Sequence, residues 1–329
     1  MKYGQINIYK LEKWYFDFLS PDHDFFFFYF ARVWFCSYRL EQIYLYLKTF
    51  KDKYSFKESL KIKSTDSAPD TTQRAIKFNQ GQLQFNASQI SVQVDFNKIL
   101  TSLNFKYSDN RFSGDSLNIN KDTGHRISWI PLTLNAEVSG EIQTPERNLK
   151  VRQFHGYIDY LTSTILPFQN PVRQLFWGRM QFPGGGLSFT CALGQQPQQR
   201  WCKIYMKIKD EYIELNEFDL LPSNWIFSQN LRLHYPANYT ITGRSANLHI
   251  EIQVENIHSL SELFFIESDG TGCSALYKFS RHLTLNPRGI KFLSRFHFRL
   301  EQNQNKEAIG PVIGITEYVV FSNNFIPAS

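Results

Sequence analysis

The sequence predicts an all-β protein that is built from antiparallel sheets. Three observations predict this class. Apolar and polar residues alternate with a period of two, turn signals recur at intervals of roughly ten residues, and aromatic residues make up 16% of the chain. Successive side chains of a strand point to opposite faces, so the alternation is typical of strands with one buried face. Evidence for helices is thin.

The first expected strands lie close together near the start of the chain. Residues 13–22, KWYFDFLSPD, combine a strand with a following turn. Asp17 in this strand, like Glu317 near the end of the chain, is expected to form hydrogen bonds at a strand end. The apolar run at 24–36 is too short to span a bilayer, so we expect a buried strand there. Residues 38–51 are compatible with either a strand or a helix.

Further along, alternation is clearest in segments that carry an apolar residue at every second position. These segments are 83–87, 90–96, 127–138, 204–208 and 246–254. Turn signals occur at 108–110, 121–124, 183–186 and 286–289. Polar, proline-containing stretches at 64–73 and 194–200 are expected to be surface loops. This arrangement favours antiparallel barrels or sandwiches.

Chain length indicates how many domains to expect. At 329 residues the chain is longer than most domains that have a single hydrophobic core, which favours two domains or one large β architecture. Pro167 and Pro171 interrupt the strand pattern and cannot join a central ladder. We therefore predict one β domain over residues 1–170 and a second over residues 171–329.

The charge pattern argues against a nucleic-acid partner. The formal net charge is +6 and the pI is near 9.0, but the lysines and arginines are scattered rather than gathered in one block. Only residues 48–63 are locally basic, and they lack the motifs of a nucleic-acid reader. We expect no nucleic acid and no integral membrane span. The oligomeric state has no signature in the sequence.

The cysteines and the familiar catalytic motifs point to no metal or cofactor. Cys36, Cys191, Cys202 and Cys273 form no CxxC pair and have no histidines at metal-ligand spacing. Because no secretory leader precedes residue 11, we expect reduced thiols in a cytoplasmic protein. No GxSxG or HExxH motif is present, and the glycines at 184–186 indicate a turn. The sequence predicts no metal, nucleotide or flavin.

The most informative stretch is 154–180, FHGYIDYLTSTILPFQNPVRQLFWGRM. Tyr157 and Asp159 are two residues apart, so in an extended chain the phenol and the carboxyl share one face, together with His155. We expect Phe154, Tyr157, Tyr160 and Phe168 to surround the Asp159 carboxyl. Burial among aromatic rings would raise its pKa and keep it protonated near neutrality. The pairing suits acid chemistry on an apolar substrate.

Several motifs along the chain also follow a known order. WYFD and an SxD turn occur at 14–22, NAEVSG at 135–140, GYxD at 156–159, WGR at 177–179, and a closing GITEY strand at 314–318. Their order and separation resemble those of the hydroxyneurosporene synthase family, the lipocalin-like carotenoid 1,2-hydratases. That superfamily also includes AttH-like proteins and fungal Diels–Alderases. The resemblance spans most of the chain.

The resemblance implies two lipocalin-like antiparallel β-barrel or sandwich domains, with a hydrophobic pocket at or near their interface for a long apolar ligand. The hydratases are thought to protonate an alkene with a Tyr and Asp pair. Tyr157, Asp159 and the upstream Trp129 occupy matching places here. The chain departs from the family where Ile158 and Tyr160 replace both histidines of the central motif.

We therefore predict a cofactor-independent cyclase, hydratase or isomerase acting on a hydrophobic polyene, polyketide or isoprenoid in natural-product biosynthesis. Asp159 is the candidate acid, and Tyr157 its hydrogen-bonding partner or a donor to the substrate. A pocket that folds a polyene into its reactive conformer could also lower the barrier without an acid, as in a Diels–Alderase-type pericyclase. The side chains expected to contact substrate are Trp129, His155, Tyr160, Phe168, Trp177 and Arg179.

Each candidate also has a purely structural explanation. Asp159 could be a buried carboxylate that pairs with Arg173 or Arg179. Tyr157 could be a core tyrosine whose hydroxyl bonds to the backbone. For the whole protein, the alternative is a non-catalytic lipocalin-like carrier of a lipid or pigment.

Overall fold

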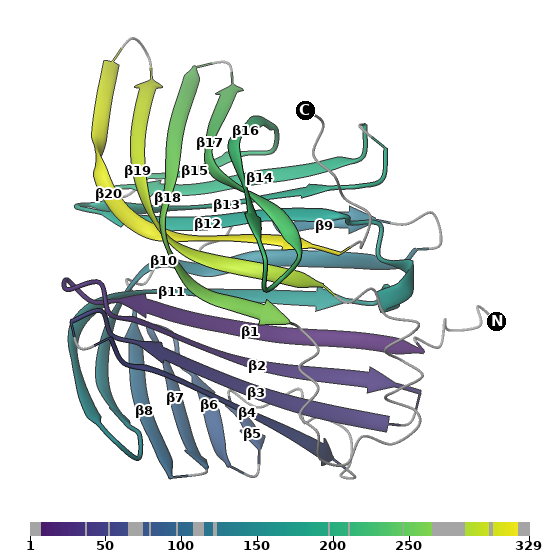
Figure 1. Cartoon of the computed structure of the whole chain (residues 1–329), viewed down its shortest axis with the longest axis vertical. Helices are drawn as coiled ribbons and strands as arrows, with labels where there is room; N and C mark the ends of the chain where they lie inside the picture. The colour runs from purple at the N-terminus through teal and green to yellow at the C-terminus, as the bar shows by residue number, and fades with distance from the viewer. Residues whose placement is uncertain are drawn as a thin grey trace. The chain divides into compact units, whose positions relative to one another are not determined.

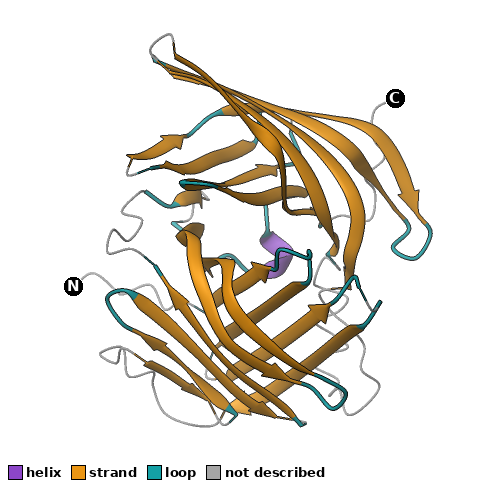
Figure 2. Ribbon diagram, turned by 90° about the vertical axis from the view of Figure 1, so that its left-hand side faces the viewer, coloured by secondary structure: helices purple, strands orange, loops and turns teal. Residues whose placement is uncertain are grey.

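The computed structural model of the chain confirms the all-β class (Figures 1 and 2). It describes residues 8–36, 38–51, 53–64, 75–78, 80–96, 98–107, 115–120, 124–196, 198–209, 211–245, 247–264, 287–302 and 305–321. Among these residues the only helix is a short 3-10 turn, η1 (Pro167–Gln169). The chain divides into two compact units. The first comprises Met1–Ser116 and Ile127–Thr164, and the second comprises Leu117–Arg126 and Ile165–Ser329.

The first unit is one antiparallel sheet with the strand order β4-β3-β2-β1-β11-β10-β8-β7-β6-β5 (Figure 1). Its strands are β1 (Tyr9–Leu19), β2 (Phe25–Phe35), β3 (Tyr38–Lys48), β4 (Ser55–Ser64), β5 (Ala75–Phe78), β6 (Gly81–Phe85), β7 (Gln89–Phe96), β8 (Ile99–Lys106), β10 (Arg126–Gln143) and β11 (Asn148–Ser163). The expected buried strand at 24–36 is confirmed as β2, and the undecided segment at 38–51 contains β3. Strands expected at 83–87, 90–96 and 127–138 are confirmed as β6, β7 and β10.

The core of the first unit lies on one face of this sheet. On β1 and β2 the even-numbered residues Phe16, Phe18, Phe26, Phe28 and Phe30 are fully buried in it. Their rings are close to one another, with centroids 5.1 Å apart for Phe18 and Phe26 and 5.7 Å apart for Phe16 and Phe28. Burial of each such side chain stabilises the fold by roughly 1.5–3 kcal/mol. This aromatic layer accounts for the high phenylalanine content of the first part of the chain.

The second unit is an antiparallel sheet of nine strands in the order β15-β14-β13-β12-β20-β19-β18-β17-β16. The strands are β12 (Gln174–Phe182), β13 (Gly185–Leu193), β14 (Arg200–Ile208), β15 (Glu211–Leu215), β16 (Phe218–Ser228), β17 (Leu233–Ser245), β18 (Leu248–Phe264), β19 (Arg288–Gln302) and β20 (Asn305–Val320). A short strand, β9 (Leu117–Asn120), is not part of this sheet; it pairs with β10 and is the eleventh strand of the first sheet. The strands expected at 204–208 and 246–254 are confirmed as parts of β14 and β18.

The turn expected at 183–186 is confirmed in part, whereas Arg288 and Gly289 of the turn expected at 286–289 begin β19, and Arg200 of the loop expected at 194–200 begins β14. Pro183 and Gly184 form the two-residue turn between β12 and β13, and Gly184 has a φ of 79°, which favours glycine. The segment 194–200 joins β13 to β14. The expected loop at 64–73 and the turns at 108–110, 121–124 and 286–289 lie wholly or partly outside the described residues.

The expectation of reduced thiols is wrong for two of the four cysteines. Cys191 on β13 and Cys202 on β14 lie directly opposite each other and form a disulfide. Both side chains belong to the core of the second unit. Cys36 is a free, exposed cysteine, and Cys273 lies outside the described residues. The pairing could not be read from spacing because it depends on the register of two neighbouring strands.

In the part of the chain that is described, no helix has the length and apolar character needed to cross a membrane. Among the same residues, no three His, Cys, Asp or Glu side chains are grouped so that they could hold a metal ion.

Candidate active site

The side of the first sheet that does not carry the Phe16 core holds a second set of buried side chains, called here the second face. It is formed by odd-numbered residues of β1, β2 and β11 and even-numbered residues of β3, which lie opposite one another in the antiparallel register. These residues are Tyr15, Asp17, Phe25, Phe27, Tyr29, Tyr44, Tyr46, Tyr157 and Asp159. In the run FFFFYF of β2, every residue except the half-buried Tyr29 is buried, because both faces of the strand are covered.

Two tyrosines and two aspartates form a square at the centre of the second face. Tyr15 lies opposite Asp159, and Asp17 lies opposite Tyr157. The exposed fractions are 4% for Tyr15, 0% for Asp17, 0% for Tyr157 and 7% for Asp159, so both carboxyl groups are buried. The Tyr15 hydroxyl donates a hydrogen bond of 2.9 Å to Oδ2 of Asp17. The shared face predicted for Tyr157 and Asp159 is thus present in the register, and a second Tyr and Asp pair stands across from it.

Asp17 is a candidate site residue that sequence reasoning missed. It was expected to bond at a strand end, and it does accept a hydrogen bond, but it is fully buried beside Tyr157. A signal was available in the sequence: Tyr15-Phe16-Asp17 repeats the spacing of Tyr157-Ile158-Asp159. When two YxD segments pair in antiparallel register, each tyrosine stands opposite the other segment's aspartate.

Aromatic rings surround this square. The Tyr15 ring stacks on Phe27 with centroids 5.9 Å apart and lies 6.4 Å from the Tyr157 ring. Phe27 in turn stacks on Tyr44 at 5.3 Å and on Tyr46 at 5.4 Å. Such a surface excludes water and lowers the local dielectric, which disfavours ionised groups.

The burial of tyrosines on the second face can be tested by measuring how the stability of the protein changes at alkaline pH. Burial raises the pKa of Tyr46 from 10.0 to about 12. The unfolded phenol ionises near its ordinary value, so the contribution to stability is complete below about pH 10 and is lost as the pH rises towards 12. We expect the urea midpoint to fall between about pH 9 and about pH 11, and the fall to be smaller in Tyr46→Phe. Tyr38→Phe, at an exposed site, is the control. An unchanged slope in Tyr46→Phe would contradict the prediction.

Of the other predicted residues in the first unit, Trp129 is buried on the second face. Pro131 of β10 lies opposite Asp159, and Trp129, two residues before it and 6% exposed, lies opposite Leu161 on the same face. His155 shares the face with Tyr157 but is exposed, and its Nδ1 lies 3.0 Å from Oδ1 of Asn135.

The expectation that Phe154 and Tyr160 surround the Asp159 carboxyl is wrong, because even-numbered residues of β11 point to the core face. The Phe154 ring lies 5.5 Å from Phe18, and the Tyr160 ring lies 4.9 Å from Trp14. Burial raises the pKa of the Tyr160 hydroxyl. Neither side chain is therefore placed on the second face. Phe168 belongs to η1, and its side chain lies outside the described residues.

In the second unit, Trp177 and Arg179 lie on one face of β12, away from the core residues Phe176 and Met180. Trp177 is 5% exposed and Arg179 is 1% exposed. Nη1 of Arg179 donates a hydrogen bond of 2.9 Å to Oε1 of Gln181, which follows on the same face.

Trp177 is also part of a row of directly opposed residues that crosses six neighbouring strands, called here the polar row. Its members in strand order are Lys203, Thr190, Trp177, Glu317, Lys291 and Ser261. Nζ of Lys291 lies 2.6 Å from Oε2 of Glu317 and 4.9 Å from the centre of the Trp177 ring. The bond expected for Glu317 is thus an ion pair whose cation is 3% exposed. Sequence reasoning missed Lys291 and Lys203 because isolated lysines in alternating strands carry no motif.

The glycine of the WGR motif has a packing role in the second unit. A Cβ atom at Gly178 would lie 2.6 Å from two carbons of the Phe189 ring. At Gly243 a Cβ would lie 2.9 Å from a terminal methyl group of Leu215, which can move. We therefore expect Gly178→Ala to lower the free energy of unfolding by roughly 1–3 kcal/mol, and Gly243→Ala by less. Urea unfolding of both variants measures this. Equal losses would show that the rigid Phe189 ring is not the obstacle.

Comparisons with known proteins identify the fold. No protein-family model matches the sequence, and no curated protein matches it either. Solved structures do match. An AttH-type protein from Nitrosomonas europaea superposes with a TM-score of 0.66 at 11% identity, covering 95% of this chain and 92% of that one. Kievitone hydratase from Nectria haematococca has a TM-score of 0.60 at 11% identity, with 94% and 89% covered.

A third match is CghA in complex with Sch210972, with a TM-score of 0.64 at 11% identity and with 96% and 89% of the two chains covered. The chain therefore has the lipocalin-like fold of AttH-type proteins, as the order of its motifs led us to expect.

Proposed function

We propose that the chain is a cofactor-independent enzyme that hydrates, cyclises or isomerises a hydrophobic polyene, polyketide or isoprenoid at the second face of its first unit. The observation that carries the proposal is the pair of crossed YxD segments, which place two buried carboxyls and two phenols on an aromatic surface. The likeness to a hydratase and to CghA, a Diels–Alderase, supports this reaction class.

The proposal gives the two buried carboxyls different roles. Asp17 and Asp159 are diagonal neighbours on adjacent strands, a relation that places such residues about 7–8 Å apart. Burial disfavours an ionised carboxyl, and so does a second negative charge nearby. Both effects favour a state in which one of the two carboxyls is protonated. The hydrogen bond from Tyr15 stabilises the ionised form of Asp17. We propose that Asp159 is the carboxyl that holds the proton and acts as the acid.

In a hydration, the Asp159 proton passes to one alkene carbon and leaves a carbocation at the other. Trp129 on the same face is the side chain proposed to stabilise that cation through its ring quadrupole. Water then adds to the cation through its oxygen, and the proton it loses returns to Asp159. In a cyclisation, the same proton activates the substrate and an internal double bond adds to the cation in place of water; the new cation then loses a proton, which returns to Asp159. In a pericyclic reaction, a hydrogen bond from Tyr157 activates the substrate and no proton is transferred.

Infrared spectroscopy tests the protonation state without a known substrate. We expect the protein at neutral pH to show the carbonyl band of a protonated, buried carboxylic acid, and Asp159→Asn to lack it. Turnover is tested by incubating the protein with kievitone, neurosporene and a linear polyene that carries an activated alkene, with products followed by mass spectrometry. An ionised Asp159, or bound ligand that is always recovered unchanged, would contradict the proposal, and the second result would favour a carrier.

A further inference from the structure

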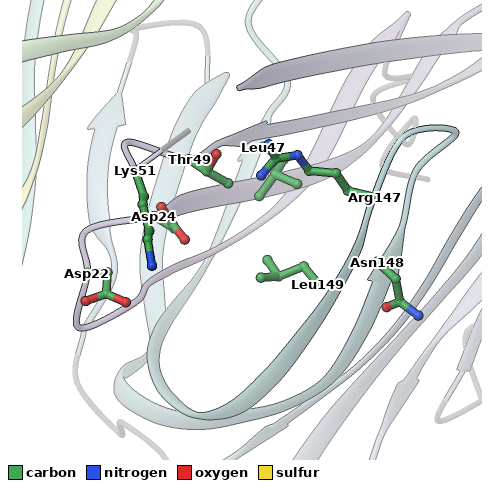
Figure 3. Close-up of a pocket in the computed structure, with 8 residues that line it drawn as sticks. All are labelled: Asp22, Asp24, Leu47, Thr49, Lys51, Arg147, Asn148 and Leu149. Atoms are coloured by element: carbon green, nitrogen blue, oxygen red, sulfur yellow. The ribbon is translucent and has the colours of Figure 1, made fainter. Parts of the chain in front are cut away.

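Three turns of the first unit, β1–β2, β3–β4 and β10–β11, meet at one end of its sheet because the strands they join are antiparallel neighbours or near neighbours. Hydrogen bonds fasten them together. The Phe50 amide donates to Oδ1 of Asp24 at 3.0 Å, and the hydroxyls of Tyr54 and Thr144 lie 3.0 Å apart. Between the turns lies a cavity of about 380 Å³ (Figure 3). This volume falls within the range of roughly 300–1,000 Å³ that is typical of small-molecule sites.

The cavity has an apolar floor with one buried polar group. Leu47 is 1% exposed and belongs to the core, and Leu149 packs against that core. Thr49 also lines the cavity and is 5% exposed. Among the described residues its hydroxyl has no hydrogen-bond partner. A buried hydroxyl without a partner is costly, so a polar atom of a ligand would stabilise it.

Charges of opposite sign stand on opposite sides of the cavity. Asp22 and Asp24 lie on one side together with Lys51, so that side keeps a net negative charge, whereas Arg147 and Asn148 lie on the other (Figure 3). Two of these charged residues, Asp24 and Arg147, are held by contacts with neighbouring residues.

The backbone amide of Asp24 donates to Oγ of Ser20 at 2.9 Å, in addition to the bond that its carboxylate accepts from Phe50. The Arg147 guanidinium lies over the Tyr54 ring, 4.6 Å from its centre. Charged groups that are already oriented lose little freedom when a ligand binds.

We propose that this cavity binds an α-amino acid that carries an apolar side chain, as a zwitterion. The ammonium group faces Asp22 and Asp24, the carboxylate faces Arg147, and the side chain lies on Leu47 and Leu149. A ligand with one charge of each sign complements the two sides of the cavity, because each of its charges faces a side that carries the opposite charge. The site uses none of the residues of the second face and does not depend on the reaction proposed there.

Calorimetric titration of the full chain with L-leucine and L-phenylalanine tests the ligand. We expect saturable binding with a Kd of about 1 mM or tighter. N-acetyl-L-leucine lacks the ammonium charge and L-leucinamide lacks the carboxylate, so each should bind at least about ten-fold more weakly. The proposal is wrong if neither amino acid binds up to about 10 mM, or if the two derivatives bind as tightly as leucine.

Variants of the walls locate the site. Arg147→Gln and Asp24→Asn should each weaken leucine binding at least about ten-fold. The exposed residues Arg152 and Asp95 of the same unit provide matched controls, and Arg152→Gln and Asp95→Asn should bind normally. If Asp24→Asn lowers the melting temperature, because an amide oxygen accepts a weaker hydrogen bond from Phe50 than a carboxylate does, Asp22→Asn replaces it in the comparison. Undiminished binding by folded Arg147→Gln would overturn the assignment.

Discussion

Replacing Asp159 by asparagine is expected to lower kcat for the protein's substrate by about 10²–10⁴-fold, because the amide cannot supply the proton that the alkene needs. Asparagine has nearly the same size as aspartate, so the fold should be retained. Asp17→Asn should also reduce kcat. The negative charge of Asp17 helps to keep Asp159 protonated, and an uncharged asparagine would not do so. Tyr157→Phe removes a single donor, for which we expect a smaller loss.

The matched control is Asp95→Asn, an exposed carboxylate on β7 of the same unit, which should leave kcat unchanged. Mass-spectrometric assays of initial rates measure all of these effects. If Asp159→Asn keeps full turnover while Trp129→Ala loses it, the acid role is wrong. The site would then work by shaping the substrate, as a pericyclase does.

Replacing Glu317 by glutamine is expected to lower the free energy of unfolding by about 3 kcal/mol, because the Lys291 ammonium would stay buried without its counter-charge. Lys291 is 3% exposed and lies 2.6 Å from the Glu317 carboxylate. Chemical denaturation measures the loss. The double variant Lys291→Met with Glu317→Gln should recover most of it, since no buried charge remains.

The exposed ion pair of Arg295 and Glu255 in the same unit is the matched control. Its partners are 41% and 53% exposed and lie 2.6 Å apart, a distance equal to that of the buried pair. Glu255→Gln should change the unfolding free energy by about 1 kcal/mol or less, because solvent screens the pair. Equal effects at the two sites would mean that the polar row is accessible to water.

The local sequence pattern was sufficient to predict the position of a strand wherever that strand has one buried face. The alternation of apolar and polar residues predicted β6, β7 and β10, because a period of two follows directly from strand geometry. It failed for β3, in which five consecutive residues, Ile43–Leu47, are buried, so that no alternation remains to be read. There the pairing of β3 with β2 and β4 decides the structure.

In the candidate site, too, some features could be predicted from the sequence and others depend on how the strands pair. The spacing of Tyr157 and Asp159 predicted that they share a face, which requires only an extended chain. It did not show which face, so Phe154 and Tyr160 were expected beside Asp159 although they point into the core. Nor did it bring in Asp17, whose role depends on the register of β1 on β11.

By itself, the sequence determined the all-β class, most strand positions and the order of motifs that indicates a lipocalin-like fold, since these depend on neighbours along the chain. Only the tertiary structure decided the crossed YxD square, the polar row, the disulfide and the cavity between the three turns. Each of these joins residues from different strands or turns. Their proximity is set by strand register and by the packing of a whole sheet, which no short segment of sequence encodes.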